Sequence, residues 1–106
     1  GVRPVASVGI DIAGEKFEAA ASGNGPVDAA IKAIKQIIRR NMTIKEFTIQ
    51  NITKGSDDIG KVHMQVESDG RVYYGFGANT DIITASVEAY IDCINKFKKT
   101  ADEHTV

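Results

Sequence analysis

The sequence has one cysteine, no long apolar run and almost no net charge, and each shortage excludes a class of protein. Cys93 alone cannot build an internal disulfide framework and fits a reducing compartment, so we expect a cytoplasmic protein. No apolar run approaches the roughly 18 residues of a membrane span, and no signal peptide is visible. The net charge of -1 argues against a nucleic-acid-binding protein and against a basic membrane-binding patch.

Side chains that carry out catalysis are also scarce. His63 lies on the polar side of an alternating strand and His104 in the polar tail, both away from any nucleophile or metal ligand in the sequence. Asp57 and Asp58 lack the regular acidic spacing of a calcium loop. The glycine-rich stretches lack the lysine of a phosphate-binding loop and the third glycine of a dinucleotide fingerprint. We therefore expect no catalytic residues, no metal and no cofactor in this chain.

The first forty residues predict a hairpin followed by a helix. Residues 5–12 alternate and predict a strand, "AGEK" predicts a turn, and residues 17–22 predict the returning strand. Pro26 marks a helix start, because proline is tolerated at the first helical position. Arg39 and Arg40 are expected to close this helix, where cations suit the negative end of its dipole.

The remaining residues repeat this order with an additional strand in front. "NMTIKEFTIQNIT" predicts a strand with a bulge, since Phe47 and Ile49 share a face that Ile44 and Ile52 do not. "KGSDDIG" predicts a loop, and "KVHMQVES" predicts a strand with alternate apolar residues. The Asp69–Gly70 pair is a hairpin signal before the strand "RVYYGFGA".

A last helix follows, capped by Asp81 or Thr80. Its apolar stripe is expected to form the buried face, and Cys93 is expected to be a buried apolar residue rather than a reactive thiol. The stripe consists of Ile83, Val87, Tyr90, Ile94 and Phe97.

The two halves form a weak internal repeat. Gly14 and Gly70 mark the two hairpin turns and lie 56 positions apart, and the same offset relates several apolar and small residues. The sequence predicts a single α+β domain over residues 1–106, with about five strands and two helices. Two pseudo-twofold-related β-hairpin–helix units place the helices on one face of a mostly antiparallel sheet. The other face must be solvated or covered by a partner, which favours a homodimer.

The turn "SGNGPVD" before the first helix has two possible explanations. Free backbone N–H groups at a helix start bind anions, and glycine lets a ligand approach the backbone closely. Alternatively, the glycines serve only a tight turn that needs unusual dihedral angles. The residues themselves leave both explanations open.

The combined motifs resemble a known family over residues 5–98. "GNGPVDAA" and "G-x-G-x-x-x-D-I-I-x-A-S-x-x-A" are similar to the C-terminal regulatory domain of α-isopropylmalate synthase, which the related citramalate synthase shares. The resemblance implies a homodimerising fragment that binds leucine, or isoleucine in the second branch, near the dimer interface, and so inhibits the enzyme. It implies a separate metal-dependent (β/α)8 barrel in the same full-length chain, which condenses acetyl-CoA with a 2-oxo acid. A dimerisation module without effector binding is the remaining alternative.

The resemblance also implies which residues contact the effector. Backbone N–H groups around the glycines would bind its carboxylate, Asp28, Asp81 or backbone carbonyls its ammonium, and apolar side chains its aliphatic group. The implied residues are Gly23, Asn24, Gly25, Val27, Asp28, Ile44, Phe47, Asn51, Asp58, Gly60, Asp81 and Ile82.

Overall fold

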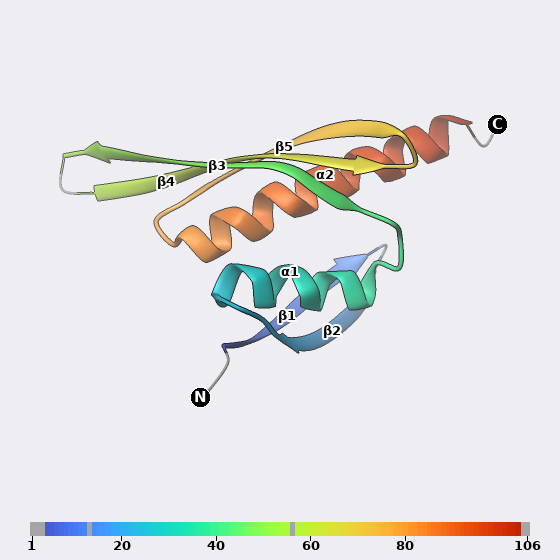
Figure 1. The fold of residues 1–106 in the computed structure, drawn as a ribbon, viewed down its shortest axis with the longest axis horizontal. Helices are drawn as coiled ribbons and strands as arrows, with labels where there is room; N and C mark the ends of the chain where they lie inside the picture. The colour runs from blue at the N-terminus through green and yellow to red at the C-terminus, as the bar shows by residue number, and fades with distance from the viewer. Residues whose placement is uncertain (1–3, 13, 56, 105–106) are drawn as a thin grey trace. The chain divides into compact units, whose positions relative to one another are not determined.

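A computed structural model describes residues 4–12, 14–55 and 57–104 (Figure 1). The order of elements is two strands, a helix, three strands and a second helix, which confirms the α+β class. The chain forms two compact units, Gly1–Arg40 and Asn41–Val106, and each is described by itself. The strands form two separate antiparallel sheets, so each helix covers a sheet of its own.

The first unit is a hairpin with a helix packed on it. Strands β1 (Val5–Ile12) and β2 (Glu15–Ser22) are paired along their whole length, and helix α1 (Pro26–Ile37) contacts both. Strand β2 starts two residues before the predicted position, because pairing continues down to Ile12 and Glu15. The prediction that Arg39 and Arg40 close the helix is wrong, since Ile38 is already extended at φ -96° and ψ 96°.

The second unit contains a sheet in the order β3–β4–β5 and a long helix. Its elements are β3 (Thr43–Lys54), β4 (Asp57–Ser68), β5 (Arg71–Asn79) and α2 (Ile82–His104). The predicted bulge is confirmed between Ile44 and Glu46. Positive φ angles at Asp69 (52°) and Gly70 (80°) match the type I′ hairpin turn that the pair predicts.

The predicted loop over "KGSDDIG" is wrong. Strand β4 begins at Asp57, and Ile52 and Ile59 are partners in the β3–β4 ladder. The Thr53 hydroxyl donates a 2.8 Å hydrogen bond to the Asp58 carboxylate across this ladder. Polar side chains that favour a loop in isolation are therefore paired with each other, and Asp58 and Gly60 belong to a strand.

The core of the second unit lies between one face of the sheet and α2. Val62, Met64 and Val66 are fully buried on that face, as the alternation predicts. The helix buries Tyr90, Ile94 and Phe97 of the predicted stripe, while Ile83 is 36% exposed, so its predicted burial is wrong. The buried face instead passes through small residues, Ala85, Ala89 and Cys93.

Two glycines explain why small helix residues occupy this face. A Cβ atom added to Gly75 would lie 2.0 Å from the Ala89 carbonyl oxygen, and one added to Gly77 would lie 2.1 Å from the Ala85 carbonyl oxygen. The backbone of α2 therefore lies directly on β5. The second glycine pair, in "GFGANTD", thus serves helix–sheet contact, and glycine inside a strand was the signal for it.

We predict that Gly77→Ala destabilises the fold by about 1–3 kcal/mol, the usual cost of overpacking. The added methyl group meets backbone atoms of α2, which cannot rotate away as a side-chain end can. Urea denaturation followed by circular dichroism measures the change. Gly9→Ala is the matched control, because a Cβ at Gly9 has no neighbour within 4 Å. Equal stability of the two variants would contradict the close contact.

Burial also changes the acid–base chemistry of two helix residues. The pKa of Tyr90 is raised to about 12 by burial and, secondly, by the nearby Cys93. The pKa of Cys93 is raised to about 11 by burial and then by Asp92, with Lys96 opposing. The thiol lies within 3.6 Å of the Tyr73 carbonyl oxygen and 3.9 Å of that of Met64. This agrees with the prediction of an inert, buried cysteine.

We predict that the Cys93 thiol reacts with a disulfide reagent at pH 8 only after unfolding, because the thiolate is the reactive form. Rapid labelling of the folded chain at pH 8 would contradict this prediction.

Both raised pKa values also predict a loss of stability in alkali. Each group keeps its full stabilising effect below its unfolded-state pKa and loses it as the pH rises through the folded value. Denaturation curves between pH 8 and 12 measure this loss of stability.

Candidate effector-binding site

The turn before α1 contains one glycine that the fold requires. Gly23 is buried, and its N–H donates a 3.0 Å hydrogen bond to the Pro4 carbonyl oxygen. A Cβ added at this position would lie 2.6 Å from the Ala29 nitrogen and 2.6 Å from the Asp28 carboxylate. Close packing of the turn against the start of α1 therefore explains Gly23.

The second glycine of the turn has no such constraint. Gly25 is the N-cap residue of α1, with φ -161° and ψ 172°, an extended conformation that any residue adopts. A Cβ at Gly25 would meet no atom within 4 Å. Positive φ angles among described glycines occur at Gly14, Gly55 and Gly70, so unusual dihedral angles do not explain either glycine of this turn.

The start of α1 presents backbone donors beside this glycine. The first N–H groups of a helix have no partner within the helix, and Gly25 provides no side chain to cap them. Pro26 occupies the first helical position, as predicted, and the Ala29 N–H bonds to the Gly25 carbonyl oxygen at 2.9 Å. The positive end of the helix dipole adds to the attraction of this position for a carboxylate.

Asp28 organises the turn from within the helix. One of its carboxylate oxygens accepts a 2.9 Å hydrogen bond from the Asn24 N–H and lies 3.1 Å from the Lys32 ammonium. Lys32 is not among the predicted site residues, although its position four residues after Asp28 is the usual spacing of a helical ion pair. The turn thus places a carboxylate, which can bind an ammonium group, next to helix N–H groups, which can bind a carboxylate.

The predicted residues of the second unit fall into separate places along its sheet. Asn51 and Gly60 are opposite each other in the β3–β4 ladder, and the Ile82 side chain lies over Gly60, with Cδ1 2.1 Å from where a Cβ would be. Ile44 pairs with Val66, six residues farther along β4 and hence about 20 Å away. The structure therefore brings Asn51, Gly60 and Ile82 together and leaves Ile44 apart.

The remaining predicted residues of this unit have partners within it. Half-buried Phe47 lies opposite Met64 on the core side of the sheet. Asp81 caps α2, as predicted: its carboxylate accepts hydrogen bonds from the Ile83 N–H and the Thr84 hydroxyl, both at 2.9 Å. Asp58 accepts the hydrogen bond from Thr53. These two carboxylates therefore stabilise local structure.

The described residues contain neither a candidate membrane-spanning helix nor a candidate metal cluster. Within the described ranges, no helix is long and apolar enough to span a bilayer. The same residues contain no group of three or more histidine, cysteine or acidic side chains arranged to hold a metal ion. His63 is exposed, as predicted, while the side chains of Asp57 and His104 lie outside the described residues.

Comparison with known proteins identifies the family. Residues 1–98 match the family described as the LeuA allosteric (dimerisation) domain. The chain belongs to this family. The match covers nearly all of both units, including the turn before α1, and confirms the resemblance on which the sequence analysis relied.

Several relatives are 2-isopropylmalate synthases. The proteins of that name from Parabacteroides distasonis and Trichodesmium erythraeum are 63% identical over 98 residues and 47% identical over 95 residues, covering 92% and 89% of this chain. The one from Hydrogenovibrio crunogenus is 38% identical over 103 residues, covering 97%. The chain spans about a fifth of the length of these relatives.

The two glycines of the turn are predicted to respond differently to the same change. Gly23→Ala should lower the free energy of unfolding by about 1–3 kcal/mol, because the methyl group meets backbone atoms of α1. Gly25→Ala should change it by less than about 0.5 kcal/mol, the usual limit for an unconstrained surface position. Chemical denaturation of both variants beside the parent measures the difference. A larger loss at Gly25 than at Gly23 would contradict this description of the turn.

Proposed function

We propose that this chain is the regulatory domain of a 2-isopropylmalate synthase and that it binds leucine as a feedback inhibitor. The family match and the names of the relatives support the synthase branch, and with it leucine rather than isoleucine. The full-length protein would be a homodimer in the cytoplasm. Its catalytic barrel, not this chain, would hold a divalent metal and condense acetyl-CoA with a 2-oxo acid.

The turn before α1 carries the proposal. Gly25 has an open Cβ position and a conformation that does not require glycine, so neither crowding nor backbone strain within the first unit explains the missing side chain. A ligand that approaches the backbone of Gly25 and the N–H groups of α1 explains it. The leucine carboxylate would bind the first N–H groups of α1, including that of Val27. Gly23 and Asn24, whose N–H groups donate to Pro4 and Asp28, would lie beside it in the turn. The ammonium would bind the Asp28 carboxylate.

The proposal includes residues of the second unit that the family resemblance implies. Phe47 would contact the aliphatic group of leucine. Ile82, Asn51 and Gly60, which the resemblance implies with it, lie together four ladder positions away, about 13 Å along β4. Replacing Phe47 by Ala should weaken binding and reduce the preference for leucine over isoleucine. One misplaced methyl group in such a pocket is typically worth about 1–3 kcal/mol.

We predict that leucine raises the melting temperature of the chain and that Gly25→Val abolishes the effect. Leucine at 100 times its dissociation constant adds about 2.7 kcal/mol if it binds only the folded state. At about 4–8 °C per kcal/mol, this corresponds to a rise of roughly 10–20 °C. Valine at Gly25 fits the extended backbone but occupies the space of the ligand. Scanning calorimetry and titration calorimetry measure both effects.

Gly9→Val is the matched control. Gly9 lies in β1 with an equally open Cβ position, so this variant should fold and bind leucine as the parent does. A folded Gly25→Val variant with unchanged leucine affinity would show that the effector does not bind at this turn. A parent chain that binds neither leucine nor isoleucine would favour a dimerisation module without an effector. A preference for isoleucine would favour the citramalate synthase branch.

A further inference from the structure

The carboxylate that is proposed to bind the effector already has a cation beside it. The Lys32 ammonium lies 3.1 Å from Oδ2 of Asp28, four residues earlier in α1. An ammonium is also the group of leucine that the proposed function assigns to Asp28. The carboxylate that the leucine ammonium needs is thus paired with a side chain of the protein itself, and the two cations compete for it.

The Asp28 carboxylate keeps its position without help from Lys32. Its Oδ2 atom also accepts a 2.9 Å hydrogen bond from the Asn24 N–H, which is a backbone group of the turn. The same oxygen lies 2.6 Å from where a Cβ on Gly23 would be, so the carboxylate is packed against the turn. Removing the Lys32 ammonium should therefore leave the carboxylate in place, and the lysine contributes its charge rather than an anchor.

The ion pair between Lys32 and Asp28 is exposed enough to exchange. The two side chains are 45% and 42% exposed, so water reaches both charges. Exposed ion pairs are weak, because water and salt screen the charges and two mobile side chains must be held together. The lysine ammonium is also strongly hydrated and sits on a flexible stem. A ligand ammonium can therefore displace Lys32 into water at a small cost.

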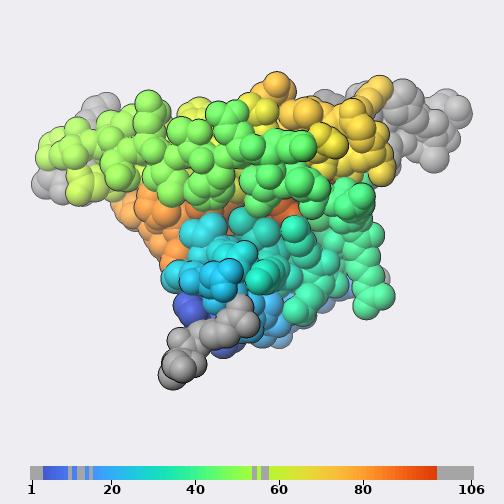
Figure 2. Space-filling model, viewed as in Figure 1, coloured from blue at the N-terminus to red at the C-terminus, as the bar shows by residue number. Residues whose placement is uncertain are grey.

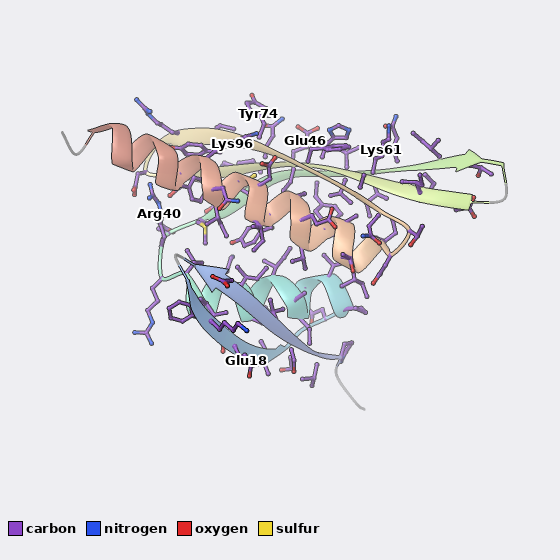
Figure 3. All side chains as sticks on the ribbon, turned by 180° about the vertical axis from the view of Figure 1, so that it is seen from behind. Glu18, Arg40, Glu46, Lys61, Tyr74 and Lys96 are labelled. Carbon is purple, nitrogen blue, oxygen red and sulfur yellow. The ribbon has the colours of Figure 1, made fainter. Side chains whose placement is uncertain are left out.

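The displaced lysine has no second carboxylate to bind among the described side chains of the first unit. The other acidic side chains described there are Asp11 and Glu18. Asp11 accepts a 3.1 Å hydrogen bond from the Gly14 N–H at the hairpin turn. Figure 3 shows Glu18 on the side of the hairpin away from α1. Displacement from Asp28 therefore exchanges the ion pair of Lys32 for contact with water.

We propose that Lys32 is an intramolecular competitor of the effector ammonium, which the effector must displace from Asp28 in order to bind. The inference rests on the proposed function and deepens it, because it names a residue that sets the affinity of that site. Binding exchanges one ion pair for another, so the attraction between leucine and Asp28 is offset by the loss of the Lys32 pair. Lys32 thereby raises the leucine concentration at which the site fills.

The exchange predicts a particular dependence of leucine affinity on salt. In the parent chain one ion pair breaks for each one that forms, so salt weakens both and the attraction to Asp28 adds little salt dependence. Without Lys32, leucine forms an ion pair and breaks none, so its affinity should be highest at low salt and fall as salt screens the new pair. A purely structural effect of Lys32 would change the affinity by the same factor at every salt concentration.

Titration calorimetry of the parent chain and Lys32→Met with leucine tests the inference. Methionine keeps an unbranched apolar chain and removes the ammonium. The titrations are made at about 0.1 M and about 1 M sodium chloride, where the Debye length is about 10 Å and about 3 Å. At the lower concentration Lys32→Met should bind leucine about 1.5–5-fold more tightly than the parent, which corresponds to the strength of an exposed ion pair. At the higher concentration this factor should fall towards one.

Two matched variants serve as controls. Lys32→Arg keeps a cation opposite Asp28 and should bind leucine as the parent does. Lys35→Met removes the same charge from an exposed position of α1, seven residues from Asp28 and hence about 10 Å along the helix. It should leave the leucine affinity unchanged at both salt concentrations. Thermal melting by circular dichroism shows that each variant is folded.

Several outcomes would overturn the inference while the proposed function stands. Unchanged or weaker leucine binding by Lys32→Met at low salt would show that the lysine does not compete. A gain of the same size in Lys35→Met would show a general effect of net charge, and a gain that persists at 1 M salt would show a structural effect. If the parent binds isoleucine instead, the same titrations use isoleucine, which carries the same ammonium. A parent chain that binds neither amino acid would overturn the proposed function and this inference together.

Discussion

The close approach of the α2 backbone to strand β5 is the constraint on which the second unit depends. Carbonyl oxygens of Ala85 and Ala89 occupy the space that side chains at Gly77 and Gly75 would need. The short distance lets Cys93 reach strand carbonyl groups, which buries its thiol. It also brings the row of Glu88, Asp92 and Lys96 to the edge of β5. Beyond the glycines the Tyr73 ring packs on Phe97 of α2, while Val72, Tyr74 and Phe76 lie on the other face of the sheet.

The two edges of this sheet are consequently different. The edge at β5 is satisfied by side chains of α2, which is one way in which proteins prevent unwanted strand addition. Strand β3 forms the opposite edge, and the space-filling view shows its green atoms at the surface along the strand (Figure 2). Its bulge at Ile44 and Glu46 and its ion pair between Lys45 and Glu67 are features that limit pairing at an exposed edge.

The two glycines of the turn before α1 show how a fold requirement differs from a ligand requirement. A side chain at Gly23 would collide with the first turn of α1, so the protein needs glycine there with or without a ligand. A side chain at Gly25 would meet empty space in the first unit. The regulatory proposal rests on this contrast, and Asp28 links the two positions through its hydrogen bond to the Asn24 N–H.

The sequence by itself determined the local elements and the family. Pro26, the Asp69–Gly70 pair and the alternation of Val62, Met64 and Val66 depend on neighbouring residues only, so each predicted its structure correctly. The motif around the first turn was enough to indicate the regulatory domain. The predicted repeat also holds for the two helices: α1 and α2 begin at Pro26 and Ile82, which are 56 positions apart, the same offset as Gly14 and Gly70.

Only the tertiary structure decided features that depend on residues distant in the chain. Asp57 to Gly60 read as a loop because their partners on β3 are not visible in a local pattern. The buried face of α2 shifted from Ile83 to Ala85, Ala89 and Cys93 because glycines on β5 admit only small helix residues at that distance. The roles of Gly23 and Gly25 likewise separated only when the space around each backbone was known, since both glycines look the same in the sequence.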